Sequence, residues 1–152
     1  MRGCEAAFLD TREVSLDTLK PDGSRIHTTF QMASVPQFLA MKGLALHNRD
    51  ESAQQTRSEN RLADARKDAY DIYFMVRNYP GGLAALSGII RPCLAEPPMR
   101  EGLQKIAAKW QSVRDRGPEL VALRKDDANE RRRLQRDVYE QVVALLRSLD
   151  LT

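Results

Sequence analysis

The sequence has few residues of the kinds that build disulfide frameworks or metal centres. Its 152 residues include two cysteines, Cys4 and Cys93, and two histidines, His27 and His47. The cysteines lie far apart and match no metal-binding or redox spacing, so we expect reduced thiols. Two scattered histidines complete no zinc-ligand pattern. These features exclude small disulfide-stapled and zinc-finger proteins as models for this chain.

Long apolar runs are also missing. No stretch approaches the roughly 18 consecutive apolar residues of a transmembrane helix. The first 13 residues carry several charged side chains and lack the apolar core of a signal peptide. The sequence therefore predicts a cytoplasmic protein without a membrane partner.

The composition is that of a folded domain with a mild excess of positive charge. Hydrophobic residues make up 42% of the chain and charged residues 30%, with 24 basic and 21 acidic side chains. A chain of this size and composition can bury a real core. The formal net charge of +3 permits a nucleotide or nucleic-acid partner without requiring one.

The opening 35 residues have β-strand character. Short strands are predicted over 6–9, 13–16 and 25–30, and the tetrad 20–23 (Lys-Pro-Asp-Gly) is a turn signal. Proline presets its backbone angle there, and Asp-Gly tolerates a positive φ. Residues 1–35 are therefore expected to form an antiparallel β-hairpin or meander, which has to pack on other elements because a lone hairpin is marginally stable.

Residues 36–152 are predicted to be a helical subdomain packed on those strands, which gives a single compact unit of mostly α, α+β class. Polar residues 48–60 are interpreted as a solvated loop or a frayed helical extension. The other breaks are expected at Pro80-Gly81-Gly82, near Pro92, and at Gly117-Pro118. Helices are predicted from Pro36, before Pro80, and over 83–90, 96–113 and 127–149.

Two helices carry ionisable residues on their apolar faces. Leu39, Lys42 and Leu46 share one face of the helix that starts near Pro36. On the next helix Asp68 lies at the edge of the apolar stripe, and Asp71 lies roughly 60° further towards solvent. That stripe is made of Ala65, Ala69, Ile72, Val76 and Tyr79.

Two interpretations of Lys42 and Asp68 remain open. In one, they form a structural salt bridge that clamps neighbouring helices. In the other, the lysine holds an anionic group such as a phosphate, and the carboxylate orients the lysine or serves as a base. Their spacing alone does not decide between these roles.

Two further features have simple structural explanations. The basic run of the last helix lacks interleaved aromatic residues and is interpreted as a solvated face in preference to a phosphate-binding patch. Trp110 is interpreted as a core anchor in preference to a base-stacking platform. The run consists of Arg131, Arg132, Arg133 and Arg136.

The segments 38–46 (FLAMKGLAL) and 66–73 (RKDAYDIY) resemble the AbiEii-type nucleotidyltransferases, a family best known as toxins of toxin–antitoxin systems. That family has a lysine helix of the form K-x-x-A-L and then a helix with an R/K-D-x-x-D-L/I pattern. Residues 42–46 and 67–72 fit the two patterns, and 78–82 (NYPGG) resemble a subgroup of predicted nucleotidyltransferases. The resemblance covers about residues 30–90 and implies the C-terminal portion of a nucleotidyltransferase-like fold.

The resemblance implies NTP-dependent nucleotidyl transfer to an acceptor such as tRNA or a protein side chain, with Mg²⁺ as cofactor. It implies that Lys42 binds the triphosphate and that Lys67 is a second cofactor-binding residue. Asp68 would support the lysine or act as the catalytic base, and Asp71 is the second choice for that role. These residue types suit the chemistry, because phosphate charge needs cations and a hydroxyl nucleophile needs a proton acceptor.

The metal site of that family is not found in this sequence. The family holds its metals with a Gly-Ser turn followed by Asp-x-Asp on a strand, whose two carboxylates share one face. Gly23-Ser24 is followed by residues 25–29, which contain no carboxylate, and Asp126-Asp127 are adjacent in sequence. We therefore expect residues 1–35 to be a remnant of the core sheet and the metal-binding half to be missing.

Two other functions compete with a truncated nucleotidyltransferase. An exposed sheet edge would suit a non-catalytic interaction module, such as a toxin–antitoxin component that meets its antitoxin, or the complementary half of a split enzyme. A small helical nucleic-acid binder would use the arginine run of the last helix.

Overall fold

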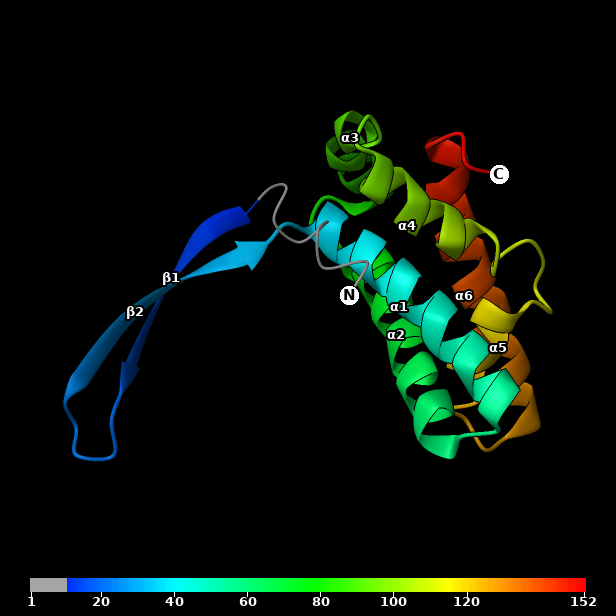
Figure 1. Cartoon of the computed structure of the whole chain (residues 1–152), viewed down its shortest axis with the longest axis horizontal. Coiled ribbons are helices and arrows are strands. Elements are labelled where there is room, and N and C mark those ends of the chain that lie inside the picture. Colours follow the sequence, from blue (N-terminus) through cyan, green and yellow to red (C-terminus); the bar gives the residue numbers. More distant parts are fainter. Residues whose placement is uncertain (1–10) are drawn as a thin grey trace.

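The computed structural model describes residues 11–152, which form an α+β fold that is mostly helical (Figure 1). A two-stranded sheet comes first and the helices follow. In chain order the elements are β1 (Thr11–Leu19), β2 (Arg25–Ala33), α1 (Val35–Thr56), α2 (Glu59–Asn78), α3 (Gly82–Cys93), α4 (Pro97–Ala107), α5 (Arg116–Ala122) and α6 (Ala128–Ser148).

The predicted hairpin is confirmed, and its strands are longer than expected. β1 and β2 pair antiparallel from Thr11 opposite Ala33 to Leu19 opposite Arg25. The turn between them is closed by the Gly23 N–H, which donates to the Lys20 carbonyl at 2.9 Å. Gly23 has φ +82°, a conformation that glycine adopts without strain. The strand expected over 6–9 lies outside the described residues.

The hairpin extends away from the helices as a twisted ribbon (Figure 1). The buried hydrophobic core is formed by helical residues and the segments that join them, and neither strand contributes to it. The helices thus pack on one another, whereas the sequence suggested that they would pack on the strands.

The first helix includes most of the segment interpreted as a solvated loop or a frayed helical extension. Pro36 occupies its first turn, and the Gln37 side chain accepts a hydrogen bond from the Ser34 N–H at 3.0 Å. The helix runs to Thr56, so of the two interpretations of residues 48–60 the helical extension is confirmed as far as Thr56 and the loop is not. The segment looked solvated because its inward positions are filled by Asp50 and Ala53 in place of large apolar side chains.

Two further boundaries differ from the predictions. The helix expected over 96–113 ends at Ala107, and Gly117-Pro118 lies inside α5 and not in a break. The reason is local packing: the Gly117 N–H donates to the Lys109 carbonyl at 2.9 Å, and a Cβ atom at Gly117 would lie 2.4 Å from the Trp110 ring. Trp110 is fully buried, so the prediction of a core anchor is confirmed.

Close packing of α1 against α4 and α2 fixes the orientation of the first helix. A Cβ atom at Gly43 would lie 2.1 Å from the Gly102 carbonyl oxygen, so the backbones of α1 and α4 meet where both lack side chains. On its α2 side, α1 buries Leu39 and Leu46 in the same core as Ile72. This arrangement directs Lys42 towards α2.

Among residues 11–152, no helix combines the length and apolar character that crossing a lipid bilayer requires.

Candidate functional site

The predicted pairing of Lys42 with Asp68 is present at the interface of α1 and α2. The Lys42 Nζ atom lies 2.8 Å from Asp68 Oδ1 and 2.7 Å from Asp71 Oδ2. Lys42 comes from the second turn of α1, and both carboxylates come from the middle of α2. The helical spacing that placed these side chains on facing surfaces was therefore correct.

Arg49 completes the cluster, and sequence reasoning missed it. Its Nη1 atom lies 2.6 Å from Asp68 Oδ2, so the two oxygens of Asp68 bind two different cations. Arg49 is seven residues after Lys42, which is nearly two helical turns, and that spacing could have identified it. We call Lys42, Arg49, Asp68 and Asp71 the Asp68 cluster.

Burial within the Asp68 cluster increases from Arg49 to Asp68. The Asp68 side chain is completely buried, Lys42 is 17% exposed, Asp71 is 28% exposed and Arg49 is 37% exposed. The helical-wheel expectation that Asp68 points inward more than Asp71 is thus confirmed. Two cations and two anions leave the cluster without net charge, and the buried Asp68 is paired with both cations.

The carboxylates keep Lys42 charged. Burial of the ammonium group acts to lower the pKa of Lys42, but the hydrogen bonds and charges of Asp68 and Asp71 outweigh it. The net result is a raised pKa. The Nζ atom also lies 5.3 Å from the centre of the Phe38 ring, a cation–π contact. Lys42 is therefore a fixed cation whose side chain is 17% exposed.

The hydrogen bonds separate the roles available to the two carboxylates. Because Asp68 is buried and both of its oxygens accept from cations, it is suited to orient Lys42 and poorly suited to take a proton. Asp71 contacts Lys42 through Oδ2 and is partly exposed, so an acceptor group could reach it. Lys67 is exposed on α2, and none of the ion pairs recorded among the described residues brings it into the cluster.

A second buried aspartate, Asp50, forms a separate cluster with side chains from α5 and from the segment that joins α4 to α5. Its Oδ2 atom lies 2.7 Å from Lys109 Nζ, and its Oδ1 atom lies 2.8 Å from Arg116 Nε. Gln54 donates to Oδ2 at 3.0 Å. We call these four residues the Asp50 cluster. Sequence reasoning missed it because residue 50 was placed in a segment interpreted as a solvated loop or a frayed helical extension.

The cations set the charge state of Asp50. Burial acts to raise the pKa of its carboxyl group, but the hydrogen bonds from Lys109 and Arg116 outweigh it and lower the pKa below the usual value. A buried carboxylate with two strong donors is stable in its charged form.

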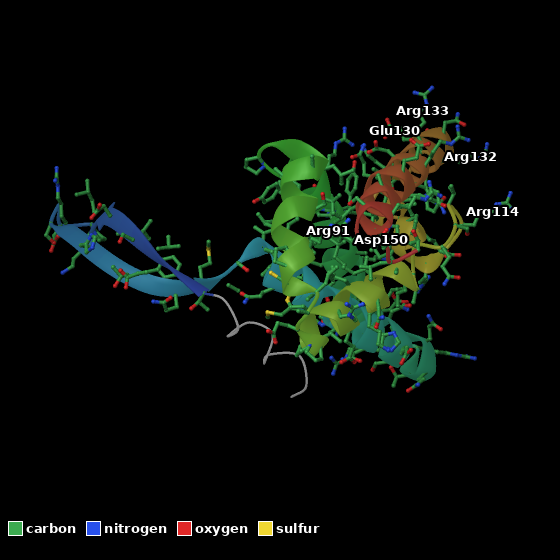
Figure 2. All side chains as sticks on the ribbon, turned by 90° about the horizontal axis from the view of Figure 1, so that it is seen from above. Arg91, Arg114, Glu130, Arg132, Arg133 and Asp150 are labelled. Carbon is green, nitrogen blue, oxygen red and sulfur yellow. The ribbon has the colours of Figure 1, made fainter. Side chains whose placement is uncertain are left out.

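The arginine run lies on the outer surface of α6. We call the packed helices α1 to α6 the helical body. Figure 2 shows Arg132 and Arg133 directed away from it, with Glu130 near them. Arg131 donates instead to the Lys125 carbonyl, by Nε at 3.1 Å and by Nη2 at 2.9 Å. These side chains are compatible with a solvated helix face.

The described residues do not fit a catalytic magnesium ion. Within residues 11–152, histidine, cysteine, aspartate and glutamate side chains form no group of three that could hold a metal. Asp68 and Asp71 both contact Lys42, so a divalent cation would have to compete with that ammonium group.

Comparisons of the sequence with protein-family models, curated proteins and solved structures found no match. The function is therefore inferred from the geometry of the described residues and from the resemblance stated above.

Proposed function

We propose that this chain takes part in nucleotidyl transfer, in which a nucleotide moves from an NTP to an acceptor such as tRNA or a protein side chain. The observation that carries the proposal is the Asp68 cluster, where two carboxylates hold Lys42 at 2.8 and 2.7 Å. The resemblance of residues 38–46 and 66–73 to AbiEii-type nucleotidyltransferases supports it. We also propose that the chain works in the cytoplasm, where NTPs and tRNA are abundant.

Lys42 and Arg49 are the cations that would bind the triphosphate. Lys42 is partly exposed and Arg49 is the most exposed member of the cluster. We therefore expect a phosphate oxygen to reach both cations from the solvent side of the cluster. Asp68 would keep both cations oriented through its two hydrogen bonds. The fixed positions of these donors reduce the entropy lost when the phosphate binds.

Asp71 is the group that would yield to the phosphate. It is the more exposed of the two carboxylates bound to Lys42, so an incoming phosphate oxygen would replace Asp71 Oδ2 at lower cost than Asp68 Oδ1. Once released, Asp71 could accept the proton of the attacking hydroxyl group. The bond that forms joins the acceptor oxygen to the α-phosphorus, and pyrophosphate leaves with the electron pair of the broken P–O bond.

The activity proposed for this chain includes no metal-dependent step. The carboxylates that would hold Mg²⁺ in the resembling family have no counterpart among the described residues, so we assign nucleotide binding to this chain and the metal site to another polypeptide segment. A purified 152-residue chain that transfers labelled nucleotide with Mg²⁺ alone would contradict this division.

Equilibrium binding of ATP and GTP tests the proposal directly. The variant Lys42→Ala should weaken binding at least about tenfold, because a hydrogen bond to a charged group contributes about 1.5–3 kcal/mol. Lys109→Ala is the matched control: it also removes a lysine bound to a buried aspartate, at 2.7 Å and with 13% exposure. Lys109→Ala should leave nucleotide affinity unchanged.

Circular dichroism of both variants separates loss of binding from loss of fold. Lys42→Arg, which keeps the positive charge, should retain part of the affinity. Undetectable binding by the wild-type chain, or equal losses in Lys42→Ala and Lys109→Ala, would contradict the proposed phosphate site.

A non-catalytic interaction module is the second candidate function. It is favoured by the hairpin, which extends away from the helices (Figure 1). The hairpin also exposes large apolar side chains, among them Leu16, Leu19 and Phe30. Such a surface suits an antitoxin or the complementary half of a split enzyme. Co-expression with the product of the upstream reading frame should then protect the hairpin amides from hydrogen exchange, and unchanged exchange would count against this function.

A further inference from the structure

The hairpin has one polar face and one apolar face. Directly paired residues of an antiparallel sheet point to the same side, so Val14 shares a face with Phe30, and Thr18 shares a face with Ile26. Leu16, Phe30 and Met32 are 54%, 44% and 39% exposed. The apolar face carries Val14, Leu16, Ile26, Phe30 and Met32, together with Thr18 and Thr28.

The helical body leaves this sheet without a third strand. Within residues 11–152 the sheet has two strands, and the ribbon extends away from the helices (Figure 1). Hairpins of two strands are marginally stable in water, and three or more strands are needed for independent stability. Addition of another strand would therefore stabilise the hairpin.

The two outer edges of the sheet differ in charge. β1 contains Glu13 and Asp17, whereas Arg25 at one end is the single lysine, arginine or acidic residue of β2. Charged side chains are a common means of preventing edge-to-edge association. The edge of β2 lacks that protection over eight consecutive residues.

The hydrogen-bonding groups on the outer edge of β2 fall on its odd-numbered residues. Next to the turn, the backbone N–H of Lys20 donates to the Ser24 carbonyl at 2.8 Å, so this is a hydrogen-bonded pair of the ladder. Because hydrogen-bonded and non-hydrogen-bonded pairs alternate along an antiparallel ladder, the groups left for another strand belong to Arg25 and every second residue after it. Thr29 is at the centre of this series.

We propose that β2 pairs antiparallel with β2 of a second copy of this chain, with the two-fold axis at Thr29. This register pairs all nine residues and places Arg25 opposite Ala33, so no like charges meet. It also places Ile26 opposite Met32 on the apolar face, at non-hydrogen-bonded positions where side chains are closest. The product is a four-stranded sheet in which the apolar faces of the two hairpins lie on the same side.

The corresponding pairing through β1 is unfavourable. A two-fold axis at Ser15, which would pair all nine residues of β1, places Glu13 opposite Asp17 twice, and like charges directly opposite each other destabilise a sheet. The charge pattern therefore selects the β2 edge. Because the contact is limited to one edge of a short sheet, the dimer should be weak and concentration-dependent.

Sedimentation velocity over a range of chain concentrations tests this dimer. The wild-type chain should shift from monomer to dimer as its concentration rises. Thr29→Lys places two ammonium groups together at the axis and should raise the dissociation constant at least about tenfold, a loss of about 1.4 kcal/mol. Ser15→Lys is the matched control, because Ser15 is the direct cross-strand partner of Thr29 and is also exposed.

A charge-reversal experiment identifies the contact itself. Thr29→Glu should be monomeric alone, and an equimolar mixture of Thr29→Lys and Thr29→Glu should form a heterodimer. A wild-type chain that remains monomeric at every concentration would overturn the proposal. A dimer that Thr29→Lys leaves intact, or that Ser15→Lys weakens equally, would also overturn it. None of these outcomes depends on nucleotide binding, so this test is independent of the proposed function.

Discussion

The two buried aspartates of the helical body have the same side chain and the same complete burial, but their partners differ. Asp68 joins α2 to α1 through Lys42 and Arg49, whereas Asp50 joins α1 to Lys109 and Arg116. The Asp68 cluster contains a second carboxylate on its solvent side. Among the described residues, the ion pairs of Lys109 involve Asp50 alone.

This difference distinguishes a structural ion pair from a candidate binding site. Lys42 has two carboxylates, and one of them, Asp71, can leave without exposing an unpaired buried charge. Lys109 cannot exchange its partner without leaving Asp50 short of a donor. The Asp50 cluster therefore holds the helices together, and the Asp68 cluster can do so while also offering a cation to a ligand.

The largest expected effect is the loss of stability in Asp50→Ala. Removal of this carboxylate leaves Lys109, 13% exposed, without its acidic partner, and breaking a buried ion pair costs about 3–5 kcal/mol. Urea denaturation should show this decrease in the free energy of unfolding. A decrease below about 1 kcal/mol, the size expected for an exposed pair, would show that the Asp50 cluster is not structurally important.

A smaller loss is expected for Asp68→Ala. Lys42 keeps Asp71 as a partner, and the more exposed Arg49 can turn to water, so the free energy of unfolding should fall by about 2 kcal/mol. The same urea experiment measures it. If Asp68→Ala were more destabilising than Asp50→Ala, the comparison between the two clusters would be reversed.

Acidic pH should lower the free energy of unfolding of the wild-type chain more than that of Asp50→Asn. The pKa of Asp50 is below its usual value of 3.8 because of Lys109 and Arg116. A carboxyl group whose pKa is lowered by folding contributes stability that is present in full above the pKa of the unfolded chain. This stability is lost as the pH falls through the pKa of the folded chain. Between pH 6 and acidic pH the unfolding free energy of Asp50→Asn should therefore decrease less steeply. Parallel pH profiles would contradict the assigned ion pairs.

The smallest effect on stability is expected for Asp71→Asn, at about 0.5 kcal/mol, because Asp71 is partly exposed. Its effect on binding should be opposite in sign: loss of the carboxylate that competes for Lys42 should tighten ATP binding. Isothermal titration calorimetry measures this change. Weaker ATP binding by Asp71→Asn would show that Asp71 helps to hold the nucleotide and does not yield to it.

Local sequence patterns could predict the Asp68 cluster but not the Asp50 cluster. Lys42 and Asp68 lie on consecutive helices, so helical periodicity was enough to place them on facing surfaces. Asp50 meets Lys109 and Arg116, which follow it by 59 and 66 residues, only after α4 and α5 have packed. In the hairpin, the Pro21-Asp22-Gly23 turn was likewise predictable, whereas the direction in which the ribbon extends depends on tertiary packing.

Nuclear magnetic resonance of the lysine side chains during titration with ATP tests the central claim most directly. Spectra are recorded on the wild-type chain, with Lys42→Arg and Lys109→Arg used to assign the two ammonium signals. We predict that the Lys42 signal shifts in a saturable way as a phosphate oxygen replaces Asp71, while the Lys109 signal remains unchanged. A Lys42 signal that stays fixed at saturating ATP, or one that moves only together with Lys109, would contradict the account.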